Sequence, residues 1–98
     1  MRVNLNREVY SDLRSILGYY VDEAGTEVAA DFYKEFRRCR LHISEFPYSC
    51  PVISEDVRRM NLTRFPFHIL YQIVEERFAK ILIVKHDSRH PLFGSERA

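Results

Sequence analysis

The pattern of apolar residues changes once along the chain, at the two prolines Pro47 and Pro51. Before them, apolar residues recur at steps of three and four, which places them on one side of an α-helix. After them come runs rich in β-branched and aromatic residues, which favour strands. Because proline cannot continue a helix, this boundary predicts a helical first half and a stranded second half.

The first half contains two amphipathic helical patterns separated by Gly25. The apolar stripe of the first pattern, from about Asn6 to Asp22, consists of Val9, Leu13, Ile16, Leu17 and Tyr20. The stripe of the second consists of Val28, Phe32, Phe36, Cys39 and Ile43. Asn6 is a suitable N-cap for the first helix, and Thr26 is expected to cap the second. So short a link predicts an antiparallel helical hairpin.

The second half predicts three successive strands. Their ranges are about Val57 to Thr63, Phe65 to Val74, and Phe78 to His86. A charged turn at residues 75–77 joins the last two, and short turns imply antiparallel pairing. Met1 to Leu5 is a candidate for one more strand at an edge. The predicted fold class is α+β, with an N-terminal helical hairpin packed on one face of a small antiparallel sheet.

Side chains alternate between the two faces of a strand, so the sequence also predicts what each face carries. The residues expected to face the helices are Phe67, Ile69, Tyr71 and Ile73 in one strand and Ile81 and Ile83 in the next. The open face is then expected to carry His68, Lys80 and His86, with Leu82 and Val84 between them and Arg58 and Arg64 at its border. A β-bulge at any point would reverse part of this assignment.

Length and composition exclude several classes of protein. The 98 residues are expected to form one domain, residues 1–98, with a modest core. No apolar run approaches the roughly 20 residues that a bilayer span needs, and the N-terminus lacks the apolar core of a signal peptide, so no membrane contact is expected. Cys39 and Cys50 are therefore expected to be reduced thiols of a cytoplasmic protein. Neither a metal-ligand spacing nor a glycine-rich phosphate loop occurs, so no metal and no cofactor are predicted.

The net charge of +1 is unevenly distributed. Residues 1–55 hold seven Lys/Arg and nine Asp/Glu, whereas residues 56–98 hold eight Lys/Arg, five Asp/Glu and three of the four histidines. A basic C-terminal half indicates a surface that contacts something anionic, although solvated cations also decorate ordinary sheets.

Two stretches of sequence, together with the order of the predicted elements, form a distinctive pattern. The segment VRRMNLTRFPFHILYQI, from Val57 to Ile73, has basic residues, a turn, aromatic and aliphatic residues and a Tyr in succession. The segment ILIVKHDSRHP, from Ile81 to Pro91, has a final strand that ends in His and is followed by Arg and Pro. Both segments and the element order resemble the RelE/ParE superfamily of bacterial toxins. The resemblance covers nearly the whole chain and implies the toxin of a type II toxin–antitoxin module.

The resemblance also implies partners. A cognate antitoxin is expected to cover a groove beside the helical hairpin or an edge of the sheet with an added helix or strand. The target is either DNA gyrase, which ParE-like toxins inhibit without being enzymes, or mRNA on the ribosome, which RelE-like toxins cleave without a metal. A third alternative is a degenerate member that binds antitoxin with little toxicity.

The candidate residues differ between these alternatives. For a nuclease, the proton-transfer and charge-stabilising candidates are His68, His86 and Arg89. Candidates for contact with the target or with nucleic acid are Arg58, Arg59, Arg64, Lys80, Lys85, His90 and Arg97. The basic cluster Arg37, Arg38 and Arg40 is a candidate antitoxin contact, with a solvated helix face as the alternative. The resemblance implies that the nuclease branch usually has an Arg on the central strand and an aromatic residue, often Tyr, near the C-terminus. This sequence has His68 and Phe93 there instead, so gyrase inhibition is slightly favoured.

Overall fold

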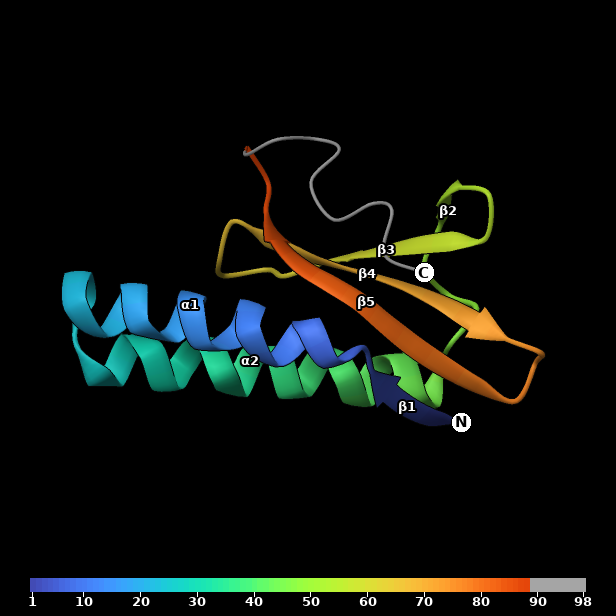
Figure 1. Ribbon diagram of the computed structural model, residues 1–98, viewed down its shortest axis with the longest axis horizontal. Coiled ribbons are helices and arrows are strands. Elements are labelled where there is room, and N and C mark those ends of the chain that lie inside the picture. The colour runs from blue at the N-terminus through green and yellow to red at the C-terminus, as the bar shows by residue number, and fades with distance from the viewer. Residues whose placement is uncertain (89–98) are drawn as a thin grey trace.

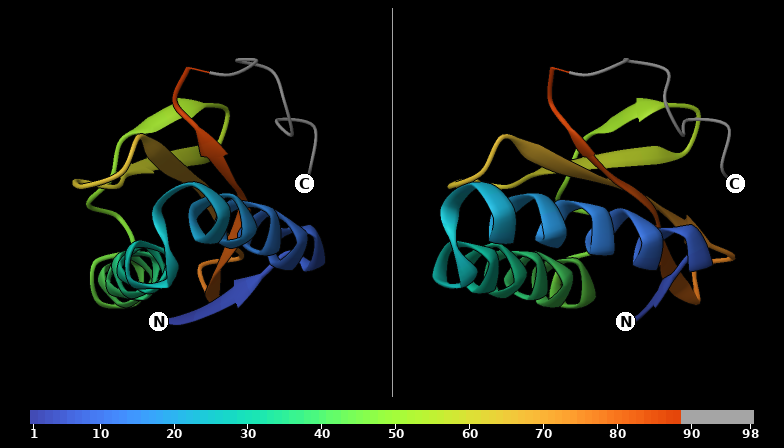
Figure 2. Two further views of the ribbon diagram at one scale, coloured as in Figure 1. Left: turned by 90° about the vertical axis from the view of Figure 1, so that its left-hand side faces the viewer. Right: turned by 60° about the vertical axis from the view of Figure 1, so that its left-hand side comes forward.

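The computed structural model describes residues 1–88, which form two helices and a five-stranded sheet. The elements are β1 (Arg2–Leu5), α1 (Arg7–Ala24), α2 (Thr26–Glu45), β2 (Val52–Ser54), β3 (Val57–Asn61), β4 (Phe67–Val74) and β5 (Phe78–His86). The two helices lie antiparallel and together cover one face of the sheet (Figures 1 and 2). The predicted α+β class with a helical hairpin on one face is confirmed.

The sheet is mixed, because its N-terminal strand runs parallel to its neighbour. The strand order is β1-β5-β4-β3-β2, and β1 pairs with β5 in parallel, while the other neighbours are antiparallel. The edge strand expected at residues 1–5 is thus present, with a direction that the sequence did not predict. The strand and the residue before it are bonded to α2: Val3 O accepts from Arg40 Nη2 at 2.9 Å, and Met1 O accepts from Ser44 Oγ at 2.6 Å.

The hairpin begins and turns where the sequence predicts. Asn6 Oδ1 accepts a hydrogen bond from the Glu8 amide at 2.9 Å, as an N-cap should. Gly25 has φ +96°, and its N–H bonds back to the carbonyls of Tyr20 and Val21. The expectation that Thr26 caps α2 is wrong: Thr26 is the first residue of the helix, and Gly25 holds the cap position without a side-chain bond.

The core lies between the hairpin and the sheet. Phe32 and Tyr71 are fully buried there, and the Phe32 ring centroid lies 5.3 Å from those of both Phe65 and Phe67, edge-on in each case. Aromatic rings in this arrangement stabilise a core beyond the area that they bury. This cluster joins α2 to the entry of β4.

A β-bulge in β5 changes which residues face the helices. Leu70 pairs with Ile83 and Tyr71 pairs with Ile81, so Leu82 is an extra residue in β5. Just beyond it, the Val84 amide donates to Asp12 Oδ2 of α1 at 3.2 Å. The predicted faces of Ile83, Val84 and His86 are therefore wrong.

The residues on each side follow from the pairing, since directly opposed residues share a face. Val84 pairs with Ile69 and belongs to the core, and His86 pairs with Phe67 on the helix side. Ile83 pairs with Leu70 on the open face. The extra residue lies in β5 and not in β4, so the bulge does not alter the face predicted for Phe67, Ile69 and Tyr71 in β4, which is confirmed.

The turn between β4 and β5 offers a test of local strain. Glu75 and Glu76 have φ of +52° and +57°, a region that disfavours residues with a Cβ. Replacing the pair by Asn-Gly, the preferred sequence for such turns, is expected to raise the free energy of unfolding by up to about 1 kcal/mol. Urea denaturation measures the change, and Arg77→Ala, at an exposed neighbouring position, is the control. A lower stability of the Asn-Gly variant would show that the positive φ angles of Glu75 and Glu76 do not strain the turn.

Candidate functional site

The open face of the sheet carries a cluster of ionisable side chains drawn from three adjacent strands. His68 in β4 is directly opposite Lys85 in β5, and Arg59 in β3 is opposite Leu70 on the same face. With Ile53, Asp87 and Ser88 these residues line a small pocket of about 180 Å³. His68 and Lys85 are buried, at 3% and 7% exposure, whereas the Arg59 side chain is 36% exposed.

Asp87 connects the members of this open-face cluster. Its Oδ1 lies 2.7 Å from His68 Nδ1 and 3.6 Å from Arg59 Nη2. Arg59 is fixed from the other side, because its Nε donates to Asn61 Oδ1 at 2.8 Å. The carboxylate therefore orients both the imidazole and the guanidinium.

Burial determines the protonation of the cluster. Burial lowers the pKa of His68 below its ordinary value of 6.5, the cations Arg59 and Lys85 lower it further, and the contact with Asp87 only partly opposes them. Burial and the neighbouring Arg59 also lower the pKa of Lys85. At neutral pH His68 is therefore predominantly neutral, and with Nδ1–H facing Asp87 its Nε2 is a potential proton acceptor.

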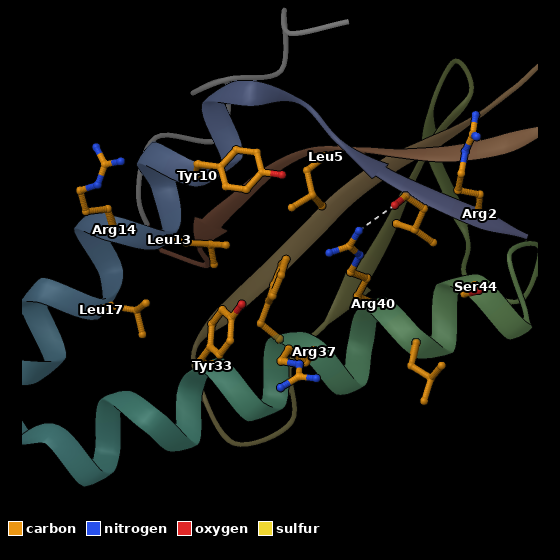
Figure 3. A pocket seen from close by; sticks show the side chains of 13 residues that line it. Arg2, Leu5, Tyr10, Leu13, Arg14, Leu17, Tyr33, Arg37, Arg40 and Ser44 are labelled. Atoms are coloured by element: carbon orange, nitrogen blue, oxygen red, sulfur yellow. Dashed lines mark hydrogen bonds between the residues drawn. The ribbon is translucent and has the colours of Figure 1, made fainter.

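A second feature is a groove of about 730 Å³ between α1, α2 and β1, shown in Figure 3. Its apolar lining consists of Val3, Leu5, Tyr10, Leu13, Leu17, Tyr33, Phe36 and Leu41. Its basic lining consists of Arg2, Arg14, Arg37 and Arg40, and no acidic residue contributes within the described part of the chain. Tyr10 and Tyr33 are exposed, at 57% and 43%, so aromatic surface is available to a partner.

The structure separates the predicted basic cluster of α2. Arg37 and Arg40 line the groove, but Arg40 also donates to Val3 O. Arg38 instead donates to Glu35 Oε2 at 3.1 Å. The same Glu35 oxygen accepts from the Thr63 amide at 2.7 Å and the Thr63 hydroxyl at 2.9 Å, which ties α2 to the loop before β4.

Two further predicted contact residues do not border the open face, contrary to expectation. Arg58 pairs with Tyr71, and its Nη1 donates to the carbonyls of Tyr48 and Cys50, so it holds the loop between α2 and β2. Arg64 lies 3.6 Å from Asp31 of α2. Both guanidiniums contribute to the arrangement of loops on the helix side.

The remaining predicted site residues are distributed as follows. Lys80 pairs with Gln72 on the open face, as expected. His86 lies on the helix side, 5.1 Å edge-on from Phe67 between ring centroids, and its Nδ1 is 3.0 Å from Ser88 Oγ. Arg89, His90 and Arg97 lie outside the described residues.

Two other classes of site gain no support within residues 1–88. No group of three or more His, Cys, Asp and Glu side chains in that part is arranged to hold a metal ion. Both cysteines are free, and burial raises the pKa of Cys39 to about 11, so its thiol is not activated.

Neither described helix is long and apolar enough to cross a membrane.

Sequence reasoning missed Asp87 as the partner of His68, and it missed the groove residues Tyr10, Tyr33 and Arg14. Asp87 lies 19 positions from His68, so only the strand register brings them together. The exposed tyrosines carry a local signal: each lies on an amphipathic helix outside the predicted apolar stripe.

Comparison with known proteins places these features in a family context. Residues 3–91 match the family model described as ParE toxin of the type II toxin–antitoxin system parDE. No curated protein matches the sequence. The structure is similar to one titled chromosomal ParDE TA system from P. aeruginosa, with a TM-score of 0.77 and 22% identity over 88% of this chain and 95% of that chain. It is also similar to the isolated E. coli RelE toxin, with a TM-score of 0.57 and 13% identity over 96% of this chain and 92% of that chain.

Proposed function

The chain belongs to the ParE toxin family of type II toxin–antitoxin systems, and from that premise we propose that it inhibits DNA gyrase in the bacterial cytoplasm until a cognate antitoxin binds it. Inhibition is by protein–protein contact, and the toxin is not an enzyme in this proposal. The observation that carries the antitoxin part is the groove between α1, α2 and β1, whose lining is apolar with four arginines. That chemistry fits an amphipathic antitoxin segment with acidic residues beside its apolar face.

The geometry of the groove favours a helix over an added strand. The carbonyl of Val3 in β1 and that of Met1 just before it already accept bonds from Arg40 and Ser44 of α2. An incoming strand would have to displace these donors. A helix laid between α1 and α2 needs only side-chain contacts, which Tyr10, Tyr33 and Leu41 offer.

Antitoxin binding is expected to weaken when the exposed lining of the groove is altered. Tyr33→Ala removes an aromatic contact and Arg37→Glu places a like charge against an acidic segment, so each is expected to weaken binding about tenfold. Titration calorimetry with the antitoxin encoded beside the toxin measures the effect. Arg64→Glu, which reverses a cation that is 65% exposed and lies outside the groove lining, is the matched control. Unchanged affinity in both groove variants would place the antitoxin elsewhere.

Gyrase inhibition is tested with purified, antitoxin-free toxin in a DNA supercoiling assay. We expect inhibition that the antitoxin reverses. Support comes from the family and from the sequence resemblance, which sets His68 of the central strand against the arginine expected of a RelE-like nuclease. Full supercoiling activity at a large excess of toxin would contradict this target.

A second candidate function is ribosome-dependent cleavage of mRNA, and the His68–Asp87 pair favours it. A neutral histidine oriented by a carboxylate is a suitable base for the 2′-OH, with Arg59 and Lys85 beside it to offset phosphate charge. Mapping of mRNA 5′ ends after incubation with translating ribosomes separates the two functions. In the nuclease case His68→Gln is expected to abolish cleavage while the antitoxin still binds.

A further inference from the structure

We propose that the groove between α1, α2 and β1 binds a second copy of this chain when no antitoxin is present, and that the occupant is the tip of that copy's β2–β3 hairpin, residues 52–56. The groove and the tip lie at opposite edges of the sheet, because β1 and β2 are its two edge strands (Figure 1). A chain therefore does not fill its own groove with its own tip, and the contact joins different surfaces of two copies. The inference rests on the groove itself and goes beyond the proposed inhibition of gyrase.

The hairpin tip presents apolar and acidic side chains together. Val52 and Ile53 are 48% and 51% exposed, and the exposed carboxylates of Glu55 and Asp56 follow them in the turn. Val52 lines a pocket on the helix side of the sheet and Ile53 lines the pocket on its open face, so the strand has an apolar side chain on each side. In the described sheet β2 pairs with β3 alone. An edge strand with exposed apolar side chains favours association between chains.

The groove has the complementary charge. Its four arginines, Arg2, Arg14, Arg37 and Arg40, are exposed, and its described lining contains no carboxylate. Within residues 1–88, no ion pair neutralises Arg37 in the groove or Asp56 at the tip. The cation nearest the tip in sequence, Arg58, already donates to carbonyls of the loop before β2. An acidic tip therefore meets unpaired guanidiniums, which suits one surface to the other.

The apolar parts of the two surfaces also match. The groove offers the exposed side chains of Tyr10, Tyr33 and Leu41 (Figure 3). Its volume of about 730 Å³ lies within the usual range of binding sites, roughly 300–1,000 Å³, so it admits a few side chains of a turn. Insertion of Val52 and Ile53 would remove apolar surface of both copies from water, which favours the contact.

The overall charge of the chain permits self-association. With a net charge of +1, two copies have little net repulsion, so the opposite charges of groove and tip determine how they approach. Exposed charges are screened by salt, and the Debye length falls from about 10 Å at 0.1 M to about 3 Å at 1 M. Association through these surfaces is therefore expected to weaken as salt is added.

Sedimentation velocity of the purified, antitoxin-free chain tests the contact. The highest concentration, about 0.2 mM, exceeds a micromolar dissociation constant by roughly two orders of magnitude. We expect the average sedimentation coefficient to keep rising with concentration beyond the value of a dimer, because each added copy leaves one groove and one tip unfilled. In about 1 M salt it should return towards the value of the monomer.

Charge variants of each surface are expected to weaken association at least about tenfold. Arg37→Glu reverses one charge in the groove, and the double variant Glu55→Gln, Asp56→Asn removes the carboxylates of the tip. The matched controls are Arg64→Glu, outside the groove lining, and the double variant Asp22→Asn, Glu23→Gln, which removes two adjacent exposed carboxylates from the last turn of α1. Both controls should associate like the wild type.

A mixture of the two weakened variants gives a readout that a folding defect would not reproduce. Arg37→Glu keeps an intact tip, and the double variant of Glu55 and Asp56 keeps an intact groove. An equimolar mixture is expected to form a 1:1 dimer that does not grow further, although each variant alone is monomeric. The opposite pairing, a reversed groove against an amide tip, has lost its charge attraction and stays weak.

The antitoxin separates this inference from the proposed function. Antitoxin added at equimolar concentration is expected to dissociate the larger species, because both occupants use the groove. Larger species that persist with the antitoxin bound would refute the place proposed for the antitoxin and leave the contact between copies intact.

Three results would overturn the contact. The first is a wild-type chain that stays monomeric at the highest concentration. The second is association that Arg37→Glu or the double variant of Glu55 and Asp56 leaves unchanged, which would indicate other surfaces. The third is a plateau at the dimer in the wild type, as symmetric pairing of two β2 edges would give.

Discussion

Replacement of Phe32 by alanine is expected to lower the free energy of unfolding by about 3–5 kcal/mol. Phe32 is fully buried in α2, and its ring contacts those of Tyr20, Phe65 and Phe67 from α1 and from the entry to β4. Truncation removes the apolar burial and the ring contacts and leaves a cavity where three segments meet. Since small domains are stable by only about 5–15 kcal/mol, much of the total stability depends on this side chain.

Chemical denaturation monitored by circular dichroism measures the Phe32 effect. Leu41→Ala in the same helix is the control, because Leu41 is 59% exposed and its truncation should change stability by less than about 0.5 kcal/mol. A similar loss in both variants would show that α2 is sensitive to any truncation. A loss below about 1 kcal/mol for Phe32→Ala would contradict the central place of the aromatic cluster.

Local sequence signals were sufficient for the elements with clear periodicity. The stripes of α1 and α2, the Asn6 cap, the break at Gly25 and the bounds of β5 follow from patterns a few residues long. β2 was missed because three exposed residues are too few to show alternation. The parallel direction of β1 was not predictable either, because it depends on how the hairpin returns the chain to β5.

The candidate site depended on information that local patterns do not contain. One extra residue, Leu82, moves His86 to the helix side and leaves Lys85 opposite His68. A prediction from strict alternation assumes that neither strand has an extra residue. It therefore assigned Ile83, Val84 and His86, which follow the bulge, to the wrong face of the sheet. Lys80 was placed correctly because it comes before Leu82 in β5. His68 was placed correctly because it belongs to β4, which has no extra residue.

Replacement of Glu35 by alanine is expected to cost about 1–3 kcal/mol at neutral pH, the second-largest effect on stability. Glu35 is 8% exposed, and its Oε2 accepts bonds from the amide and hydroxyl of Thr63 and from Arg38. The variant leaves the Thr63 amide without this acceptor and frees the loop before β4 from α2. Arg38→Ala distinguishes the ion pair from the bonds to Thr63. It removes only the half-exposed partner of the ion pair and should lower the free energy of unfolding by less than about 1 kcal/mol.

The effect of Glu35 should also depend on pH, with a definite sign. Burial by itself raises the pKa of this carboxyl, but the bonds from Thr63 and Arg38 outweigh burial and hold the pKa below its ordinary value of 4.5. A lowered pKa in the folded state means that the stabilisation is present above 4.5 and is lost as the pH falls through the folded-state value. The difference in stability between wild type and Glu35→Ala should therefore shrink in acid. A difference in stability that stays constant down to pH 3 would show that Glu35 acts through the packing of its methylene groups, because these groups, unlike the carboxylate, do not titrate.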